Sequence, residues 1–387
     1  MKKKRRFGRR VFCVLIVLFM GVIWQSDLLS QEPAEVRSLR KQEILQTDDN
    51  YREYYFGLLT EDEKKIYREM LSGIQERQDE FYLTSSNEQL ISKVYHALLK
   101  DHPELFWVHN REEVYTTAYK GTDYCRFSPG YTYTDQEIQE IMAFMEHALE
   151  EVKEQITQDM SAYDKVKTVY TYLIDHAEYE ASGDDQNIAG IFWKKKAVCA
   201  GYARAVQYLL EQLGVPCIYV EGNARDSDEG HAWNIVFLDG DWYYIDPTWG
   251  DASYQREEGE ETPTLTETVN YDYFCVTTQE IERTHSMDDN QLLPVCNAVQ
   301  DQYYRHEGLY LQSADKEKID EIFARAAQKG APMVCFQCAD DTVYQEVYRL
   351  LIEEQGIFAY LPELETTAAY LDSDRERTFY FWFTEVS

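Results

Sequence analysis

The stretch from Ala197 to Asp251 constrains the fold of this chain most, because a helix start and a β-hairpin follow one another within it. Its first part, AVCAGYARAVQYLLEQLG, predicts a helix that begins at Cys199. Apolar side chains recur there at helical spacing, at Tyr202, Val206, Leu209 and Leu213. Gly214 and Pro216 follow where a helix is expected to end. The sequence therefore predicts a thiol at the N-terminus of an amphipathic helix.

The predicted position of Cys199 favours its thiolate form. The N-terminus of a helix offers unsatisfied N–H groups and the positive end of the helix dipole, and both stabilise an anion. Three positive residues, Lys194, Lys195 and Lys196, lie just upstream of the thiol. The alternative is a small, inert cysteine in a buried helix start, since free cysteines are among the most buried residues.

The second part of the stretch predicts a hairpin. His231 opens the apolar run HAWNIVFL, Asp239-Gly240 follows, and WYYID completes the pattern. Asp-Gly between two strand-like runs is typical of a two-residue hairpin loop. In that register Trp233 faces Asp246, and His231 and Asp246 are diagonal neighbours on one face. A slip of one residue would separate them. The alternative is a strand-end histidine and an aspartate that only begins the Asp-Pro-Thr turn.

A thiol, an imidazole and a carboxylate are the groups that thiol-based acyl transfer requires. They supply a nucleophile, a base that activates it, and a group that orients the base. In chain order the predicted candidates are Cys199, His231 and Asp246.

Three motifs in this order, VCAGYA, GHAWNIV and WYYIDPTWGD, resemble the transglutaminase-like superfamily, whose fold is papain-like. The resemblance is clear over about Ala162 to Asp251. It continues more weakly through YDYFCVTTQEIERTH and LPVCNAV, as in secreted bacterial members. It implies that Cys199 is the nucleophile, that His231 is the general base and acid, and that Asp246 orients His231. We expect neither a cofactor nor a metal ion.

Two segments depart from the pattern of the superfamily. The residues before the thiol read NIAGIFWKKKAVC, where a smaller, glycine-containing segment is more usual. Gly250 precedes Asp251 where an acidic residue is common. Both departures bear on substrate preference and not on the candidate residues Cys199, His231 and Asp246.

The expected mechanism follows from these groups. His231 takes the proton of Cys199, and the thiolate attacks a carboxamide or peptide carbonyl. The backbone N–H of Cys199 is an expected donor to the oxyanion, and Gln186 and Trp193 are candidate upstream donors. The acyl group then passes to water or to an amine, and the sequence does not choose between them.

The N-terminal residues predict export. Residues 1–10 hold seven Lys or Arg, and residues 11–24 are the apolar run VFCVLIVLFMGVIW. This is the pattern of a signal peptide over residues 1–30, followed by a linker over residues 31–50. The apolar run is shorter than the roughly 20 residues of a membrane span, but no clear cleavage site follows it. An uncleaved signal-anchor that holds the protein in the membrane is therefore the alternative, and in both cases the rest is extracytoplasmic.

Charge and cysteine content limit the partners. The formal net charge of −32 argues against nucleic acid as a partner, and a solvated acidic surface is the simplest explanation. Of the eight cysteines, Cys335 and Cys338 form a C-x-x-C that has no second pair, so zinc is not expected. The acidic loop 223–230 lacks EF-hand spacing.

The rest of the chain predicts two flanking modules and an α+β fold class. We expect an α+β module over residues 51–156, the transglutaminase-like core over 157–300 and a small α/β module over 301–387. In the first module, capping boxes at Thr60 and Ser86 predict helix starts, and a box at Thr134 predicts the start of a long helix. In the last, strand, helix, strand, helix and strand follow in turn, with Ser313 capping the first helix.

The predicted function is extracytoplasmic cleavage of peptide or amide bonds by a cysteine protease or amidase. One alternative is a protein-crosslinking transglutaminase. Another is a non-catalytic protein of the cell surface that binds peptides or glycans in the same cleft. The 31 tyrosines and seven tryptophans suit such a surface, although they suit a core equally well.

Overall fold

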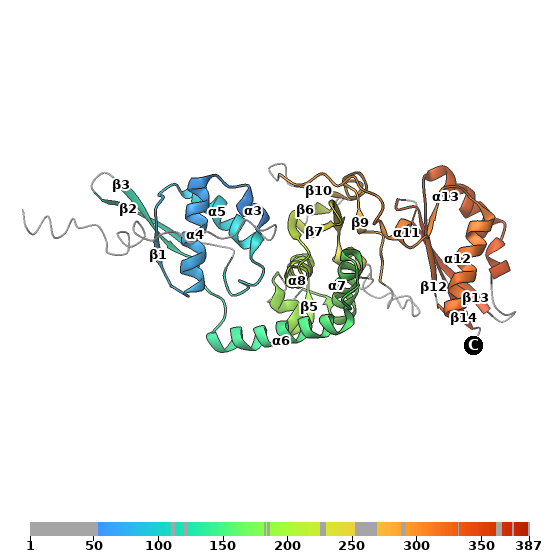
Figure 1. Ribbon diagram of the computed structural model, residues 1–387, viewed down its shortest axis with the longest axis horizontal. Coiled ribbons are helices and arrows are strands. Elements are labelled where there is room, and N and C mark those ends of the chain that lie inside the picture. The colour runs from blue at the N-terminus through green and yellow to red at the C-terminus, as the bar shows by residue number, and fades with distance from the viewer. Residues whose placement is uncertain are drawn as a thin grey trace, which may run out of the picture. The chain divides into compact units, whose positions relative to one another are not determined.

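The computed structural model of the chain describes residues 53–109, 113–119, 122–181, 183, 186–224, 230–251, 269–287, 292–331, 333–360, 366–373 and 375–385. These residues form an α+β protein, as predicted, and divide between Thr134 and Asp135 into two units (Figure 1). The predicted leader and linker lie outside the described residues, as do most of the acidic loop 223–230 and the segment 252–268. Within the described ranges, no helix combines the length and the apolar character that a membrane span needs.

The first unit packs helices against a three-stranded antiparallel sheet of order β1-β3-β2. The buried carboxylate of Asp101 ties the start of this unit together, because it accepts hydrogen bonds from the backbone of Tyr55 and Phe56 and from the Tyr67 hydroxyl. The elements are α3 (Tyr54–Gly57), α4 (Glu61–Gln75), β1 (Phe81–Leu83), α5 (Glu88–Asp101), β2 (Glu113–Tyr119) and β3 (Thr122–Ser128).

One of the two helix starts predicted in this unit is confirmed and the other is wrong by one residue. Thr60 and Glu63 form a reciprocal capping box at the start of α4. Asn87, and not Ser86, caps α5, because its side-chain oxygen accepts the N–H of Leu90 at 3.2 Å. Asn and Ser are equally good caps, so the pattern alone did not distinguish adjacent positions.

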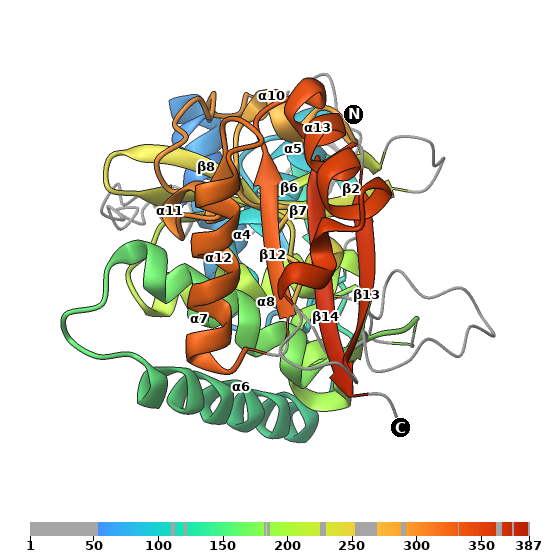
Figure 2. The ribbon, with the colours of Figure 1, turned by 90° about the vertical axis from the view of Figure 1, so that its right-hand side faces the viewer.

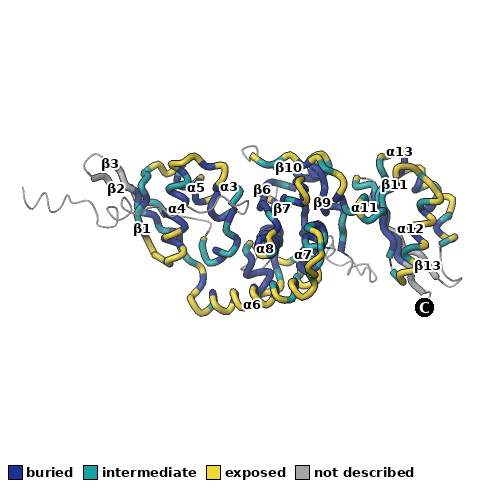
Figure 3. Tube along the Cα trace, in the orientation of Figure 1, coloured by how far each residue is buried: buried dark blue, intermediate teal, exposed yellow. Residues whose placement is uncertain are grey.

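The second unit is built on a five-stranded antiparallel sheet of order β10-β6-β7-β8-β9. Helix α8 packs against β6 and β7, and α7 packs against α8. Figure 3 shows that β6 and β7 are largely buried, whereas α6 is largely exposed. The strands are β6 (Cys217–Ala224), β7 (Gly230–Leu238), β8 (Asp241–Ile245), β9 (Phe274–Val276) and β10 (His285–Met287).

The predicted hairpin register is confirmed. Leu238 pairs with Asp241 and Asn234 pairs with Ile245, so the loop consists of Asp239 and Gly240 alone. Both loop residues have positive φ, 47° and 104°, as a type I′ turn requires. This register brings the first residues of β7 opposite the end of β8.

Helices and short strands complete the core of the second unit. They are α6 (Asp135–Gln155), α7 (Ala162–His176), β4 (Glu178–Tyr179), η1 (Gly190–Lys194), β5 (Lys196–Ala197), α8 (Cys199–Gln212), α9 (Pro247–Gly250), α10 (Thr278–Ile281) and α11 (Tyr303–His306). The contacts group α6 with this unit, since it packs on α7 and η1. That grouping differs from the boundary predicted after residue 156, and the boundary at 300 stays a prediction.

The C-terminal part forms a four-stranded sheet of order β11-β12-β14-β13, with α12 and α13 on one face (Figure 2). Phe336, Phe379 and Phe381 point toward these helices, whereas Cys335 and Tyr380 cluster with Tyr304 on the opposite face. The elements are β11 (Tyr310–Leu311), α12 (Lys316–Lys329), β12 (Met333–Cys338), α13 (Asp341–Tyr348), η4 (Arg349–Glu353), η5 (Gly356–Tyr360), β13 (Thr366–Ser373) and β14 (Thr378–Glu385).

Two details of the C-terminal prediction are corrected. Asp315, and not Ser313, caps α12, because its carboxylate accepts the N–H of Glu317 at 2.9 Å. The sheet also contains β13, which the sequence analysis did not predict and which pairs with β14 along its full length. Its sequence, TTAAYLDS, has little of the hydrophobic alternation that marked the other strands.

Gly222 allows the strands on either side of β6, which are β10 and β7, to approach closely. It pairs with His231 of β7 and with Met287 of β10. A Cβ at this position would lie 2.2 Å from the carbonyl oxygen of Ser286 and 2.7 Å from the ring of Trp233. A side chain here would therefore have to displace β10 or the buried tryptophan.

We expect Gly222→Ala to lower the free energy of unfolding by about 1–3 kcal/mol, as overpacking of a core usually does. Urea denaturation measures the effect. Gly230→Ala, on the neighbouring strand, is the matched control, since its Cβ would meet no atom closer than 3.9 Å. Equal stability of the two variants would contradict the proposed close approach of β10.

Candidate active site

Cys199 is the first residue of α8, as the sequence predicted. Val198 precedes it in extended conformation and caps the helix without a side-chain hydrogen bond. The thiol residue is 9% exposed and packs in a small apolar cluster with Ala200, Ala203, Tyr219 and Ala232. The N–H groups of the first turn are thus not occupied by a capping side chain of Val198, which suits an anion at this position.

Asp246 lies where β8 ends and α9 begins, and it is fully buried. One carboxylate oxygen, Oδ1, accepts the backbone N–H groups of Thr248 at 2.9 Å and Trp249 at 3.2 Å. The Asp-Pro-Thr turn that the sequence suggested is therefore present as an N-cap. These two bonds fix the carboxylate and leave Oδ2 to face the sheet.

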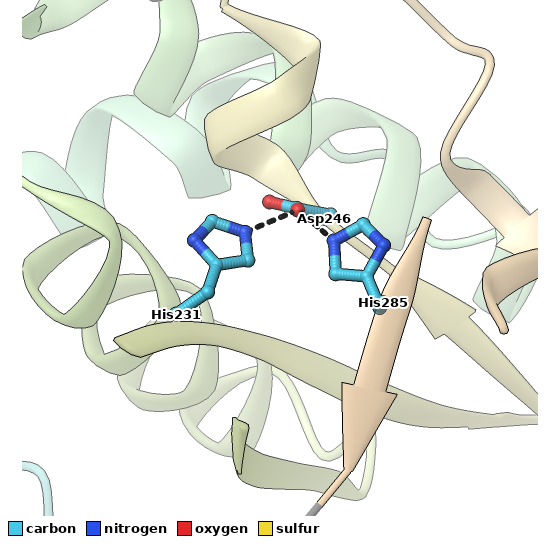
Figure 4. Close-up of side chains that lie close together, drawn as sticks. All are labelled: His231, Asp246 and His285. Carbon is cyan, nitrogen blue, oxygen red and sulfur yellow. Dashed lines mark hydrogen bonds and ion pairs between the residues drawn. The ribbon is translucent and has the colours of Figure 1, made fainter. Parts of the chain in front are cut away.

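His231 lies on β7 with its imidazole directed at Asp246 (Figure 4). Its Nε2 donates to Oδ2 of Asp246 at 2.7 Å, and the residue is 6% exposed. The predicted contact between these two side chains is thus confirmed, and it follows from the hairpin register. Their catalytic roles stay a prediction.

Electrostatics joins the three predicted residues. Burial by itself lowers the pKa of His231, but the charge and hydrogen bond of Asp246 and a hydrogen bond with Cys199 raise it to about 10. Burial acts to raise the pKa of Asp246, yet His231 and His285 hold it well below its usual range. The thiol, the imidazole and the carboxylate therefore form one interacting group in which the imidazole prefers to be charged.

His285 is a site residue that the sequence analysis missed. It is fully buried on β10, and its Nε2 lies 3.0 Å from the same Oδ2 of Asp246 (Figure 4). The only signal was its place in the segment TQEIERTH, where the resemblance continued weakly. Because β10 has three residues and lies beside β6 rather than β8, no local pattern placed His285 near Asp246.

Aromatic side chains enclose the two imidazoles. Trp249 lies 6.1 Å from His231 and 4.7 Å from His285, measured between ring centroids. Trp233 and Tyr273 approach the His285 ring to 4.9 and 5.5 Å. The rings separate the carboxylate from solvent, and a low dielectric strengthens its interaction with a charged imidazole.

Gly250, one of the two departures from the superfamily pattern, is explained by Tyr170 of α7. The hydroxyl of Tyr170 donates to the backbone oxygens of Asp246 and Asn270, each at 3.0 Å. A Cβ at position 250 would lie 2.0 Å from that hydroxyl. A glycine is needed here because the Tyr170 hydroxyl, which is hydrogen-bonded to the turn after β8, occupies the space of a side chain.

The two candidate oxyanion donors upstream of the thiol lie in different settings. Gln186 is exposed in a turn. Trp193 is half-buried in η1, and the Lys194 ammonium lies 3.3 Å from the centre of its ring. Neither role is decided by these positions, so both stay predictions.

His231, Asp246 and His285 also offer ligand atoms within 4.8 Å of one another, which is a grouping that metal ions use. The distances of 2.7 and 3.0 Å between nitrogen and Oδ2 are those of hydrogen bonds. A zinc ion would require both Nε2 atoms to lose the protons that Oδ2 accepts, and it would sit about 2.0–2.1 Å from each nitrogen. We therefore describe His231, Asp246 and His285 as a hydrogen-bonded group.

Comparison with known proteins assigns the family. The model of the transglutaminase-like superfamily matches residues 150–247, which include Cys199, His231 and Asp246. The chain therefore contains a transglutaminase-like domain over these residues. The resemblance predicted from the three motifs is thus confirmed, together with the α+β, papain-like class of the core. The superfamily includes cysteine peptidases and acyltransferases.

The chain is similar to the kyphoscoliosis peptidase of Mus musculus, with 28% identity over 117 residues. That match covers 26% of this chain and 18% of the relative, so the chain spans less than a fifth of that relative. Among solved structures, one titled as a TGase has a TM-score of 0.27 at 16% identity and covers 40% of this chain and 47% of its own. A putative cysteine protease from Cytophaga hutchinsonii has a TM-score of 0.24 at 15% identity, with 36% and 63% covered.

We expect Asp246→Asn to lower the pKa of His231 from about 10 to or below the usual value near 6.5, because the charge that raises it is lost while burial remains. Titration of the histidine resonances by NMR measures the shift, with His231→Gln identifying the signal.

The same shift sets the pH dependence of stability. Because the folded-state pKa of His231 is raised, its contribution to the free energy of unfolding is fully present below about pH 6.5 and is lost as the pH rises through about 10. In Asp246→Asn this loss should be absent from the alkaline range. A His231 that titrates near 6.5 in the unaltered protein would contradict the pairing.

Proposed function

We propose that the protein is an extracytoplasmic cysteine protease or amidase that cleaves peptide or amide bonds through Cys199, His231 and Asp246. The observation that carries the proposal is the buried hydrogen bond of 2.7 Å between His231 and Asp246. Cys199 interacts with the same imidazole through a hydrogen bond. The basic and apolar N-terminal pattern supports the extracytoplasmic location.

In the proposed reaction His231 accepts the proton of Cys199 and becomes an imidazolium paired with Asp246. The thiolate attacks the carbonyl carbon, and N–H groups at the start of α8 stabilise the oxyanion. The imidazolium returns its proton to the leaving amine, which departs as the acyl-enzyme forms. Water, activated by His231, then attacks the thioester, the acid is released, and Cys199 regains its proton.

A crosslinking transglutaminase differs only in the second step, where a primary amine replaces water. The family assignment supports acyl transfer in general and does not choose the acceptor. A non-catalytic peptide- or glycan-binding protein would not need a thiol linked to a charged imidazole. The coupling of Cys199 to His231 therefore favours an enzyme.

We expect iodoacetamide to alkylate Cys199 quickly at pH 6 in the unaltered chain, and roughly 100-fold more slowly in His231→Ala. The reason is that an ordinary thiol, with a pKa near 8.5, is less than about 1% ionised at that pH. Mass spectrometry of peptides locates the label on Cys199, which distinguishes it from the other buried cysteines. Equal alkylation rates in the two proteins would show that no thiolate–imidazolium pair forms, and would favour a binding role for the cleft.

The acceptor is tested by substrate screening with Cys199→Ala as the inactive control. We expect unaltered protein to release new amino termini or free carboxylates from a peptide mixture, and Cys199→Ala to release none. A labelled primary amine in the same reaction tests the alternative. Incorporation of the amine at a rate above that of hydrolysis would identify a transglutaminase instead.

A further inference from the structure

His285 is buried beside the reacting groups and has no part in the acyl transfer described above. Its ring is fully enclosed, with Nε2 3.0 Å from Oδ2 of Asp246 and Nδ1 2.9 Å from the hydroxyl of Thr284. It comes from β10, on the opposite side of β6 from the strand that carries His231. Two imidazoles therefore reach one carboxylate oxygen from two strands (Figure 4).

The hydrogen bonds of His285 assign its tautomer. An ionised carboxylate only accepts hydrogen bonds, so Nε2 of His285 must carry a proton. The Thr284 hydroxyl lies 2.9 Å from Nδ1 and 3.4 Å from the carbonyl oxygen of Ile281, and when it donates to the nearer Nδ1, that nitrogen accepts. A neutral His285 satisfies both contacts, and the single charge of Asp246 remains available to one imidazolium, that of His231.

The His285 bond completes the hydrogen bonding of Asp246. Oδ1 accepts two backbone N–H groups, and Oδ2 accepts one N–H from each imidazole, so the carboxylate accepts four hydrogen bonds in total. A carboxylate that accepts several hydrogen bonds in a buried site stays ionised and cannot rotate without breaking them.

We propose that His285 is a positioning residue of the active site: its Nε2–H fixes Oδ2 of Asp246 opposite His231 and keeps the carboxylate ionised. The inference rests on the proposed function, because the pair that it supports is the one assigned to catalysis. Water does not substitute easily for the ring, since Trp233, Trp249 and Tyr273 pack around it.

Other polar groups near His231 and Asp246 come from α8, from α7 and from the residue before β9. Cys199 of α8 acts on His231, the Tyr170 hydroxyl of α7 donates to the backbone oxygen of Asp246, and the hydroxyl of Tyr273, which donates to Glu376 at 2.6 Å, interacts with Thr284 beside His285.

The test compares His285→Gln with His285→Met in the full chain. The two side chains have nearly the same length and shape, but only Gln offers an N–H to Asp246. The measurement is the rate of Cys199 alkylation by iodoacetamide between pH 4 and 10, with the melting temperature of each variant recorded. Alkylation needs no substrate, so a failed substrate screen would reject the protease proposal and leave this test valid.

We expect His285→Met to slow alkylation at pH 6 by about 10-fold. The pH at which alkylation becomes fast should rise, because Asp246 is then more easily protonated and no longer stabilises the charged form of His231 that pairs with the thiolate. His285→Gln should stay within about threefold of the unaltered chain, as rescue by the donor requires.

Two results would overturn the proposal for His285 and leave the proposed function standing. If both variants keep the unaltered pH profile, the bond does not position Asp246. If both variants slow alkylation by the same factor and have equal melting temperatures, the ring has only a packing role. If His231→Ala does not change the pH profile of alkylation, the proposed function and this inference are both rejected.

A milder pair of variants covers the case in which His285→Met does not fold. Thr284→Val removes the hydroxyl that holds Nδ1 and keeps the side-chain shape, and Thr284→Ser keeps the hydroxyl. We expect Thr284→Val to raise the pH at which alkylation becomes fast, as His285→Met does, and Thr284→Ser to leave that pH unchanged. Identical profiles for the two would overturn the proposal.

Discussion

The active-site half of the second unit depends on one buried charge, the carboxylate of Asp246. Burial of an unpaired carboxylate costs several kcal/mol, so the surrounding elements must supply hydrogen bonds. They do so from three directions: the first turn of α9 supplies two N–H groups, β7 supplies His231, and β10 supplies His285. Each of these elements is in place because of the five-stranded sheet, which sets β7 and β10 on either side of β6.

A second buried carboxylate in the same unit shows what decides the charge state. Asp272 accepts hydrogen bonds from the hydroxyls of Tyr304, Tyr380 and Thr378, and it joins the core to the C-terminal sheet. Burial raises the pKa of Asp272 to about 6, because hydroxyl donors only partly offset it. Asp246 is buried at least as deeply, but two imidazoles hold its pKa far lower. The two carboxylates thus differ in their neighbours, because hydroxyls and the charge of Glu376 surround Asp272, whereas imidazoles contact Asp246.

The amino-acid sequence predicted the elements whose signals are local. The start of α8 at Cys199, the Asp-Gly loop and the Thr60 capping box all follow from residues within a few positions of one another. Where two adjacent residues were equally good caps, as at Ser86 and Asn87, the prediction missed by one position. Strand β13 was missed because its pairing with β14, and not its own pattern, makes it a strand.

For the active site, the sequence by itself determined the thiol at a helix start and the pairing of His231 with Asp246, because a two-residue turn sets the register over the whole hairpin. It did not determine that a second histidine shares the same carboxylate oxygen. His285 is 39 positions from Asp246 and reaches it from the far edge of the sheet. Only the tertiary structure decided that contact, since it depends on strand order and on the close approach that Gly222 allows, and neither leaves a local pattern in the sequence.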